Sequence, residues 1–153
     1  MILDRWVASR AVAAAKAQIG KRYVWGAAGP DAFDCSGLMW SAWKKAGFSF
    51  QRTTAAKLAV HPLVRPVSLT DLLPGDMIFY GNPITHVAMY VGDGKIVHAR
   101  GGSAVGLGTI RGPGTPVSAV RVISAAKAGV SLWLIGGLAL ISVLTIYQRR
   151  QRR

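Results

Sequence analysis

Cys35 is the single cysteine of the 153-residue chain, and it directly follows Asp34 in the segment "FDCSGLMWSAW". Asp is a frequent N-cap residue, so a helix is predicted to begin at Cys35. The free N–H groups and the positive end of the helix dipole stabilise a thiolate there and lower its pKa. The position therefore suits a nucleophile, although a cysteine at a helix start is by itself equally compatible with a structural role.

His86 and His98 lie in two apolar runs that flank "GDG", a pattern that predicts a β-hairpin. The two rings can touch only if they share one face of that hairpin. A two-residue turn at 93–94 would place them on opposite faces. A three-residue loop over 92–94 pairs Ala88 with His98 and sets His98 diagonal to His86 on the same face, so we predict this loop.

The elements that would position these residues can be read from the periodicity of apolar residues. Residues 1–20 predict an amphipathic helix, with Ile2, Trp6, Ala13 and Ile19 available for a core and Gly20 as its C-cap.

The Cys35 helix should end at Lys44, Lys45 and Gly47, with Trp40 or Trp43 buried on it. The other predicted elements are an extended segment at 22–26, a turn at 74–76, a strand at 77–80, glycine-rich loops around a short strand at 100–116, and a last strand at 117–123.

Six pieces of the chain resemble, in the same order, the NlpC family of bacterial cell-wall cysteine endopeptidases. They are "YVWG", "FDCSGL", "QRTT", "LLPGDMIFY", "HVAMYVGDGK" and "IVHA". Each piece is weak alone, but six in sequence are specific, and the resemblance covers about residues 11–123. It implies a small papain-like α+β domain, with the cysteine at a helix N-terminus packed against an antiparallel sheet that bears the histidine.

The resemblance also implies a site and a substrate. Cys35 matches the nucleophile, His86 the general base, His98 the polar residue that orients the base, and Tyr23 a tyrosine that helps to hold the reacting carbonyl. The usual substrate is the stem peptide of peptidoglycan, cut between D-glutamate and a diamino acid. No metal or cofactor is implied, and the sequence has no zinc-ligand spacing.

Other residues of the matched segments are candidates for contacts with the substrate. Arg52 could pair with a carboxylate of the stem peptide, or could be an ordinary surface charge. Lys57 stands where the family commonly carries Gln, which puts contacts there in doubt. The full set of oxyanion and substrate candidates is Tyr23, Trp25, Asp34, Ser36, Arg52 and Thr53. His61 has no motif around it and is interpreted as structural or solvent-facing.

The net charge of +13, with 19 Lys and Arg against six acids, favours an anionic partner such as a lipid surface or an acidic wall polymer. A basic surface with no dedicated ligand is the alternative. Because the cations are scattered and not interleaved with aromatic residues, nucleic acid is not expected as a partner.

Residues 128–147 carry no charge, and a helix of that length covers about 30 Å, the thickness of a bilayer core. We predict a transmembrane helix there, a peptidase domain at 1–127 and a basic tail at 148–153; a buried helix is the alternative. The tail arginines would hold their flank in the cytoplasm and turn the domain toward the cell wall. No signal peptide is seen.

Three other functions compete with the endopeptidase. One is a papain-like lipid acyltransferase with a C-terminal membrane span, although such enzymes typically present the histidine before the cysteine, and here Cys35 comes first. A related amidohydrolase would cut the bond between N-acetylmuramic acid and L-alanine, and a non-catalytic module would only bind the wall. An intact Cys–His–His set argues against the non-catalytic module. The sequence does not choose between a bacterial and a bacteriophage origin, and it gives no oligomeric state.

Overall fold

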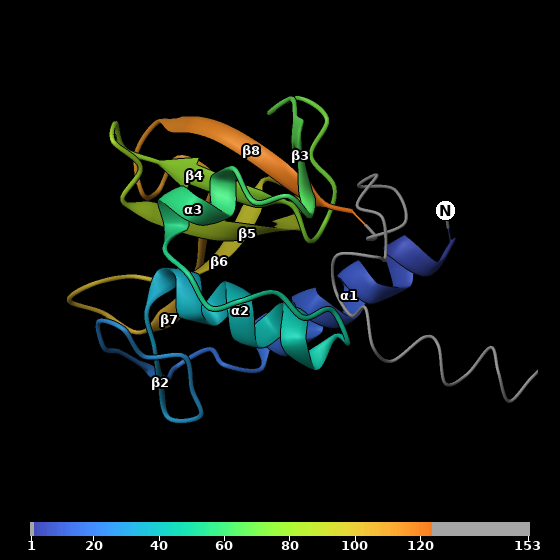
Figure 1. Cartoon of the computed structure of the whole chain (residues 1–153). Coiled ribbons are helices and arrows are strands. Elements are labelled where there is room, and N and C mark those ends of the chain that lie inside the picture. The colour runs from blue at the N-terminus through green and yellow to red at the C-terminus, as the bar shows by residue number, and fades with distance from the viewer. Residues whose placement is uncertain (1, 124–153) are drawn as a thin grey trace, which may run out of the picture. The chain divides into compact units, whose positions relative to one another are not determined.

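One antiparallel sheet dominates the fold (Figure 1). The computed structural model describes residues 2–123, in which six strands pair in the order β3-β8-β4-β5-β6-β7. They are β3 (Val64–Val67), β4 (Met77–Tyr80), β5 (His86–Gly92), β6 (Lys95–Ala99), β7 (Val105–Thr109) and β8 (Pro116–Val122). The two shorter strands β1 (Arg22–Tyr23) and β2 (Ala32–Phe33) form a separate parallel pair.

Two helices, α1 (Ile2–Lys16) and α2 (Cys35–Lys45), lie side by side beneath the sheet in Figure 1. A third short helix, α3 (Ala55–Ala59), follows α2 and contacts β5 and β8. This arrangement confirms the predicted α+β class. It also packs α2 against β5, the strand that begins with His86.

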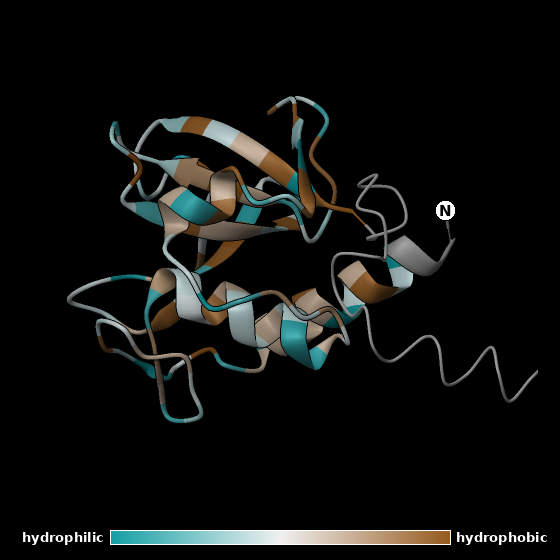
Figure 2. Cartoon of the chain, in the orientation of Figure 1, coloured by the Kyte–Doolittle hydropathy of each residue, from teal (hydrophilic) through white to brown (hydrophobic). Residues whose placement is uncertain are grey.

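Both faces of β4 are buried, which explains its unbroken apolar run. Met77 and Phe79 belong to the main core, together with Leu38 of α2, whereas Ile78 and Tyr80 belong to a smaller cluster. This alternation follows from the period of two along a strand. Figure 2 shows hydrophobic and hydrophilic residues interspersed along β8.

Helix α1 uses a different face for the core from the one predicted. Ala11 and Ala15 are fully buried, whereas Trp6 is 56% exposed and Ala13 and Ile19 are also exposed. The reason is close packing against α2, which small side chains permit and a tryptophan would prevent. The helix ends at Lys16, so Gly20 closes the turn that follows it and is not its C-cap.

Helix α2 has the predicted bounds. Asp34 is its N-cap, with a side-chain oxygen that accepts a hydrogen bond from the backbone N–H of Gly37, and Gly47 adopts a positive φ of 92° after its last turn. Trp43 is buried, as expected for one of the two tryptophans, and Trp40 donates a hydrogen bond to the carbonyl of Phe50.

The remaining strands also follow the sequence closely. The turn at 74–76, strand β4, the short strand β7 within the glycine-rich segment and the last strand β8 are confirmed, the last one shifted by one residue. Strand β3 and helix α3 were not predicted. Thr54 caps α3 by accepting a hydrogen bond from Lys57 N–H, so the "QRTT" segment also starts a helix.

The predicted transmembrane helix at 128–147 and the tail at 148–153 lie outside the described residues. Within residues 2–123, no helix combines the length and the apolar character that a membrane crossing requires. The compact unit that contains the sheet and helices ends at Ile123.

Gly37 on α2 should be intolerant of any side chain. A Cβ there would overlap the carbonyl oxygen of Ala27 and lie 3.0 Å from the Cα of Ala28. We expect Gly37→Ala to lower the free energy of unfolding of the full chain by about 3 kcal/mol or more, as overpacking against backbone does. Thermal and urea unfolding followed by circular dichroism would measure it.

Gly106→Ala on β7 is the matched control, because the nearest atom to its added Cβ lies 4.0 Å away. Equal stabilities for the two variants would contradict the close approach of α2 to residues 27–28.

Candidate active site

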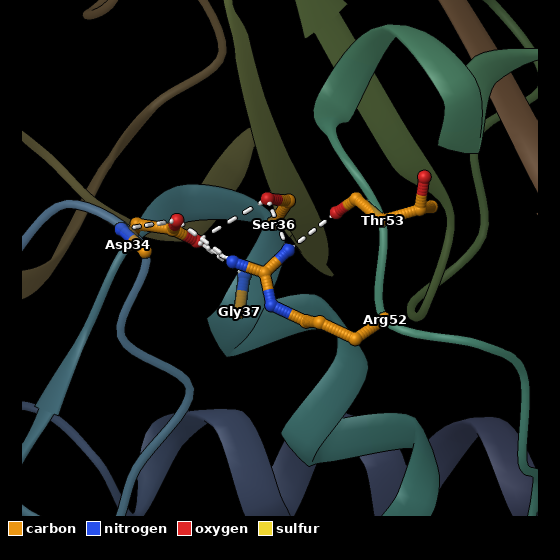
Figure 3. A network of polar contacts seen from close by, with 6 residues as sticks. Asp34, Ser36, Gly37, Arg52 and Thr53 are labelled. Carbon is orange, nitrogen blue, oxygen red and sulfur yellow. Dashed lines mark hydrogen bonds and ion pairs between the residues drawn. The ribbon is translucent and has the colours of Figure 1, made fainter.

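Asp34 organises the start of α2 around Cys35 (Figure 3). One oxygen, Oδ1, accepts hydrogen bonds from Gly37 N–H at 2.6 Å and from the Ser36 hydroxyl at 3.2 Å. The other, Oδ2, accepts from Gly26 N–H at 2.9 Å. Cys35 is only 8% exposed. The carboxylate thus fixes both the helix start that carries the thiol and the loop that precedes it.

Arg52 completes this network and is not free for a substrate. Its Nη2 atom lies 2.7 Å from each oxygen of Asp34, and its Nη1 atom donates to the Ser36 hydroxyl at 2.8 Å and to the carbonyl of Thr53. The structure therefore pairs Arg52 with Asp34 of the chain itself, in place of the substrate carboxylate that the sequence suggested. Figure 3 shows the guanidinium lying between Asp34 and the backbone of Thr53.

The hairpin of β5 and β6 has the predicted register but a different turn. Met89 pairs with Val97, which is the register that sets Ala88 opposite His98, as predicted. The turn itself is the two residues Asp93 and Gly94, with φ of 52° and 68°.

A bulge reconciles the two observations. Gly92 pairs with Lys95, and the register shifts between Tyr90 and Gly92, so one extra residue stands on β5. The predicted three-residue loop is therefore wrong, but the predicted placement of His98 on the same face as His86 is confirmed. The extra residue restores the register that the short turn would have lost.

The two histidines form a direct pair. His86 Nε2 lies 2.9 Å from His98 Nδ1, and the rings meet edge to face with centroids 5.1 Å apart. His98 is buried, with 8% exposed. Because this contact uses Nε2 of His86, its Nδ1 atom is left for another partner. When His86 Nε2–H donates to His98, the unprotonated Nδ1 is the one able to accept a proton.

The thiol of Cys35 meets β5 next to His86. The backbone N–H of Val87, the residue that follows His86, stabilises the ionised sulfur and so lowers the pKa of Cys35. Helix α2 packs against β5. The fold thus brings the N-terminus of α2 to the first residues of β5, which are about fifty positions away in the sequence.

The pKa of Cys35 is raised from its ordinary 9.0, which corrects the expectation of an acidic thiol. Burial is the main cause, and the carboxylate of Asp34 adds to it; the N–H groups of Val87, Ser36 and Cys35 itself act in the opposite direction. The helix start favours the thiolate as expected, but desolvation outweighs it.

Burial also keeps the histidines neutral. Together with the charges of His98 and Arg100, it lowers the pKa of His86 from 6.5 to about 4, and burial and Arg100 lower the pKa of His98. A neutral thiol and a neutral imidazole are therefore the resting state near pH 7. Such a pair can still react, because the base takes the thiol proton as the sulfur attacks.

Tyr23 lies in the same electrostatic environment as the thiol. Burial raises the pKa of its hydroxyl, and the charges of Cys35 and Asp34 raise it further. Trp25, in the loop between β1 and β2, is 84% exposed. That loop is tied to Asp34 through the N–H of Gly26, the residue that follows Trp25.

His61 has no part in this cluster. Its Nδ1 atom accepts a hydrogen bond from Leu63 N–H at 3.1 Å, and its ring packs 5.6 Å from that of Phe50. Within residues 2–123, no three metal-ligating side chains converge.

Sequence reasoning missed three features of the site. The Arg52–Asp34 pair joins positions 18 apart and has no local signal. The Val87 N–H affects the pKa of Cys35 only because α2 packs against β5, which the sequence does not show. Arg100, two residues after His98, could have been found by asking which charges share a strand face with the histidines.

The chain belongs to the NlpC/P60 family, whose sequence profile matches residues 20–124. A probable endopeptidase of Corynebacterium glutamicum is 44% identical over 88 residues, which are 58% of this chain and 41% of that protein. The solved structure of NlpC1 from Trichomonas vaginalis is 34% identical, with a TM-score of 0.67 over 75% of this chain and 43% of that one.

The peptidoglycan hydrolase RipB of Mycobacterium tuberculosis is 28% identical, with a TM-score of 0.67 over 78% of this chain and 66% of its own. These likenesses confirm the papain-like fold. The chain spans less than half of the length of the curated relatives it matches.

The resting protonation state predicts how Cys35 reacts with iodoacetamide as pH changes. Because its pKa is raised above 9.0, the thiolate fraction is small at neutral pH and keeps growing beyond pH 9. The alkylation rate of the full chain should therefore still rise between pH 8 and pH 10. Mass spectrometry of the alkylated chain measures it. A rate that is level from pH 5 to pH 8 would reveal a thiolate–imidazolium pair instead.

Proposed function

We propose that this protein is a peptidoglycan hydrolase, a thiol endopeptidase that cuts the stem peptide between D-glutamate and a diamino acid. One observation carries the proposal. His86 is hydrogen-bonded to His98, and the residue that follows it on β5, Val87, has a backbone N–H that stabilises the ionised sulfur of Cys35. The curated relatives are named probable endopeptidases, and RipB is named a peptidoglycan hydrolase, which supports the same reaction and substrate class.

The reaction begins with proton transfer. Nδ1 of His86 takes the thiol proton while the sulfur of Cys35 attacks the carbonyl carbon of the scissile amide. The developing oxyanion is stabilised by the Cys35 backbone N–H and by the Tyr23 hydroxyl. The imidazolium of His86 then protonates the leaving amine, the C–N bond breaks, and a thioester remains on Cys35.

Water completes the cycle. His86, again neutral, takes a proton from a water molecule while the water oxygen attacks the thioester carbonyl. His86 then returns that proton to the sulfur of Cys35, the C–S bond breaks, and the peptide leaves as a carboxylic acid. His98 is a positioning residue in both halves: its Nδ1 atom accepts from Nε2–H of His86 and so keeps the Nδ1 lone pair of His86 available. The Asp34–Arg52 network holds the sulfur at the helix start.

Muropeptide analysis tests the reaction and its bond. The full chain incubated with purified peptidoglycan should release fragments with a new free amine on the diamino acid, detected by mass spectrometry. Cys35→Ala should abolish release, and His86→Ala should slow it by about 100-fold or more, the usual contribution of a general base.

His61→Ala is the matched control, because it removes the same side chain outside the cluster. A new amine on L-alanine would identify an amidase instead. Intact muropeptides with every variant, at unchanged thermal stability, would identify a binding module.

We also propose that residues 128–147 anchor the chain in a membrane, with residues 1–127 toward the cell wall. The segment has no charge, carries Trp133 and Tyr147 toward its ends, and precedes the basic tail. The full chain expressed in bacteria should stay in the membrane pellet after an alkaline carbonate wash, as immunoblots would detect. Leu138→Arg with Ile141→Arg should release it.

The control adds two arginines elsewhere, at the exposed Leu107 and Val117 of the described domain, and should remain in the pellet. Release of the unaltered chain by the wash would rule out the anchor.

A further inference from the structure

Arg100 is a charged residue at the rim of the site that the reaction above does not use. It directly follows β6, which ends at Ala99, and it is exposed. Alternate residues of a strand share a face, so Arg100 continues the face that carries His98. Its guanidinium is close enough to both histidines to lower the pKa of each.

The segment that begins at Arg100 also borders Tyr23. Ser103 N–H donates to the carbonyl of Arg100 at 3.1 Å, which closes a turn, and Tyr23 N–H donates to the carbonyl of Ser103 at 3.3 Å. A Cβ on Gly101 would lie 3.8 Å from the Tyr23 ring. The backbone that carries Arg100 is therefore fixed between Tyr23 and the histidine pair.

Arg100 differs in one respect from the other arginine of the site. The ion pairs among residues 2–123 are Arg52–Asp34 and Arg121–Asp76, and Arg100 takes part in neither. A cation without an internal partner beside two neutral imidazoles costs electrostatic free energy, since it disfavours their protonation during the reaction. A role toward the substrate would offset that cost.

We propose that Arg100 is a specificity residue, which binds a carboxylate of the substrate next to the scissile bond. This inference rests on the proposed function. D-glutamate has two carboxyl groups and the scissile amide uses only one, so a second group, either a carboxylate or its amide, lies near the reacting carbonyl. A guanidinium forms two parallel hydrogen bonds with a carboxylate, and it cannot pair with a neutral amide in the same way.

Substrate kinetics test the preference directly. The probes are two synthetic stem peptides that differ only in this group, carboxylate or carboxamide. The unaltered chain should have the lower KM for the carboxylate, and Arg100→Gln should raise that KM about 10-fold or more with little change for the amide. Arg100→Lys should recover part of the preference. Lys95→Gln, at the far end of β6, removes the same charge and should leave it unchanged.

A second measurement needs no hydrolysis. Cys35 is alkylated in parallel by iodoacetate, which is anionic, and by iodoacetamide, which is neutral. Any change in the pKa of Cys35 affects both rates equally, so their ratio reports the charge that faces the sulfur. Arg100→Gln should lower the ratio of iodoacetate to iodoacetamide rates about 3-fold or more at low salt, and Lys95→Gln should not.

The two measurements separate the two proposals. If no peptide is cleaved, the proposed function fails, and the alkylation ratio alone decides whether Arg100 presents its charge to anions at Cys35. If peptides are cleaved with equal KM for carboxylate and amide, the specificity role is overturned. An alkylation ratio that Arg100→Gln leaves unchanged overturns it as well, provided that thermal unfolding finds the variant folded.

Discussion

The carboxylate of Asp34 holds together three segments that meet only in the folded chain. It accepts hydrogen bonds from the loop before β2, from the first turn of α2 and from Arg52 in the segment before α3. A buried carboxylate is stable only when it is paired and fully hydrogen-bonded. The position of the nucleophile depends on this carboxylate, because the same contacts fix the backbone around Cys35 at the start of α2.

The same carboxylate limits how acidic the thiol can be. It stands one residue before Cys35 and, together with burial, raises the pKa that the helix start alone would lower. Burial and the charge of Arg100 lower the pKa of both histidines and keep them neutral. The thiol and the imidazoles thus rest uncharged, and in the proposed reaction the N–H groups at the helix start stabilise the thiolate once His86 has taken the proton. The carboxylate that fixes the backbone around Cys35 therefore also makes its thiol less acidic.

The β5–β6 hairpin solves a separate geometric problem. The two histidines must share a face, and a tight turn of two residues would separate them. The bulge between Tyr90 and Gly92 adds one residue to β5 and returns His98 to the face of His86. The same alternation carries Arg100 to the rim of the site. A local irregularity of one strand therefore decides which side chains meet several residues further along.

The sequence by itself determined the elements whose signals are local. The cap at Asp34, the bounds of α2 and strand β4 all follow from spacing and from the chemistry of single residues. Tertiary structure decided the rest. Alanines, and not Trp6, face the core on α1 because α2 packs against them. Arg52 forms an ion pair with Asp34, a residue that only folding brings beside it. The pKa of Cys35 is raised because its burial, too, depends on residues that are distant in the sequence.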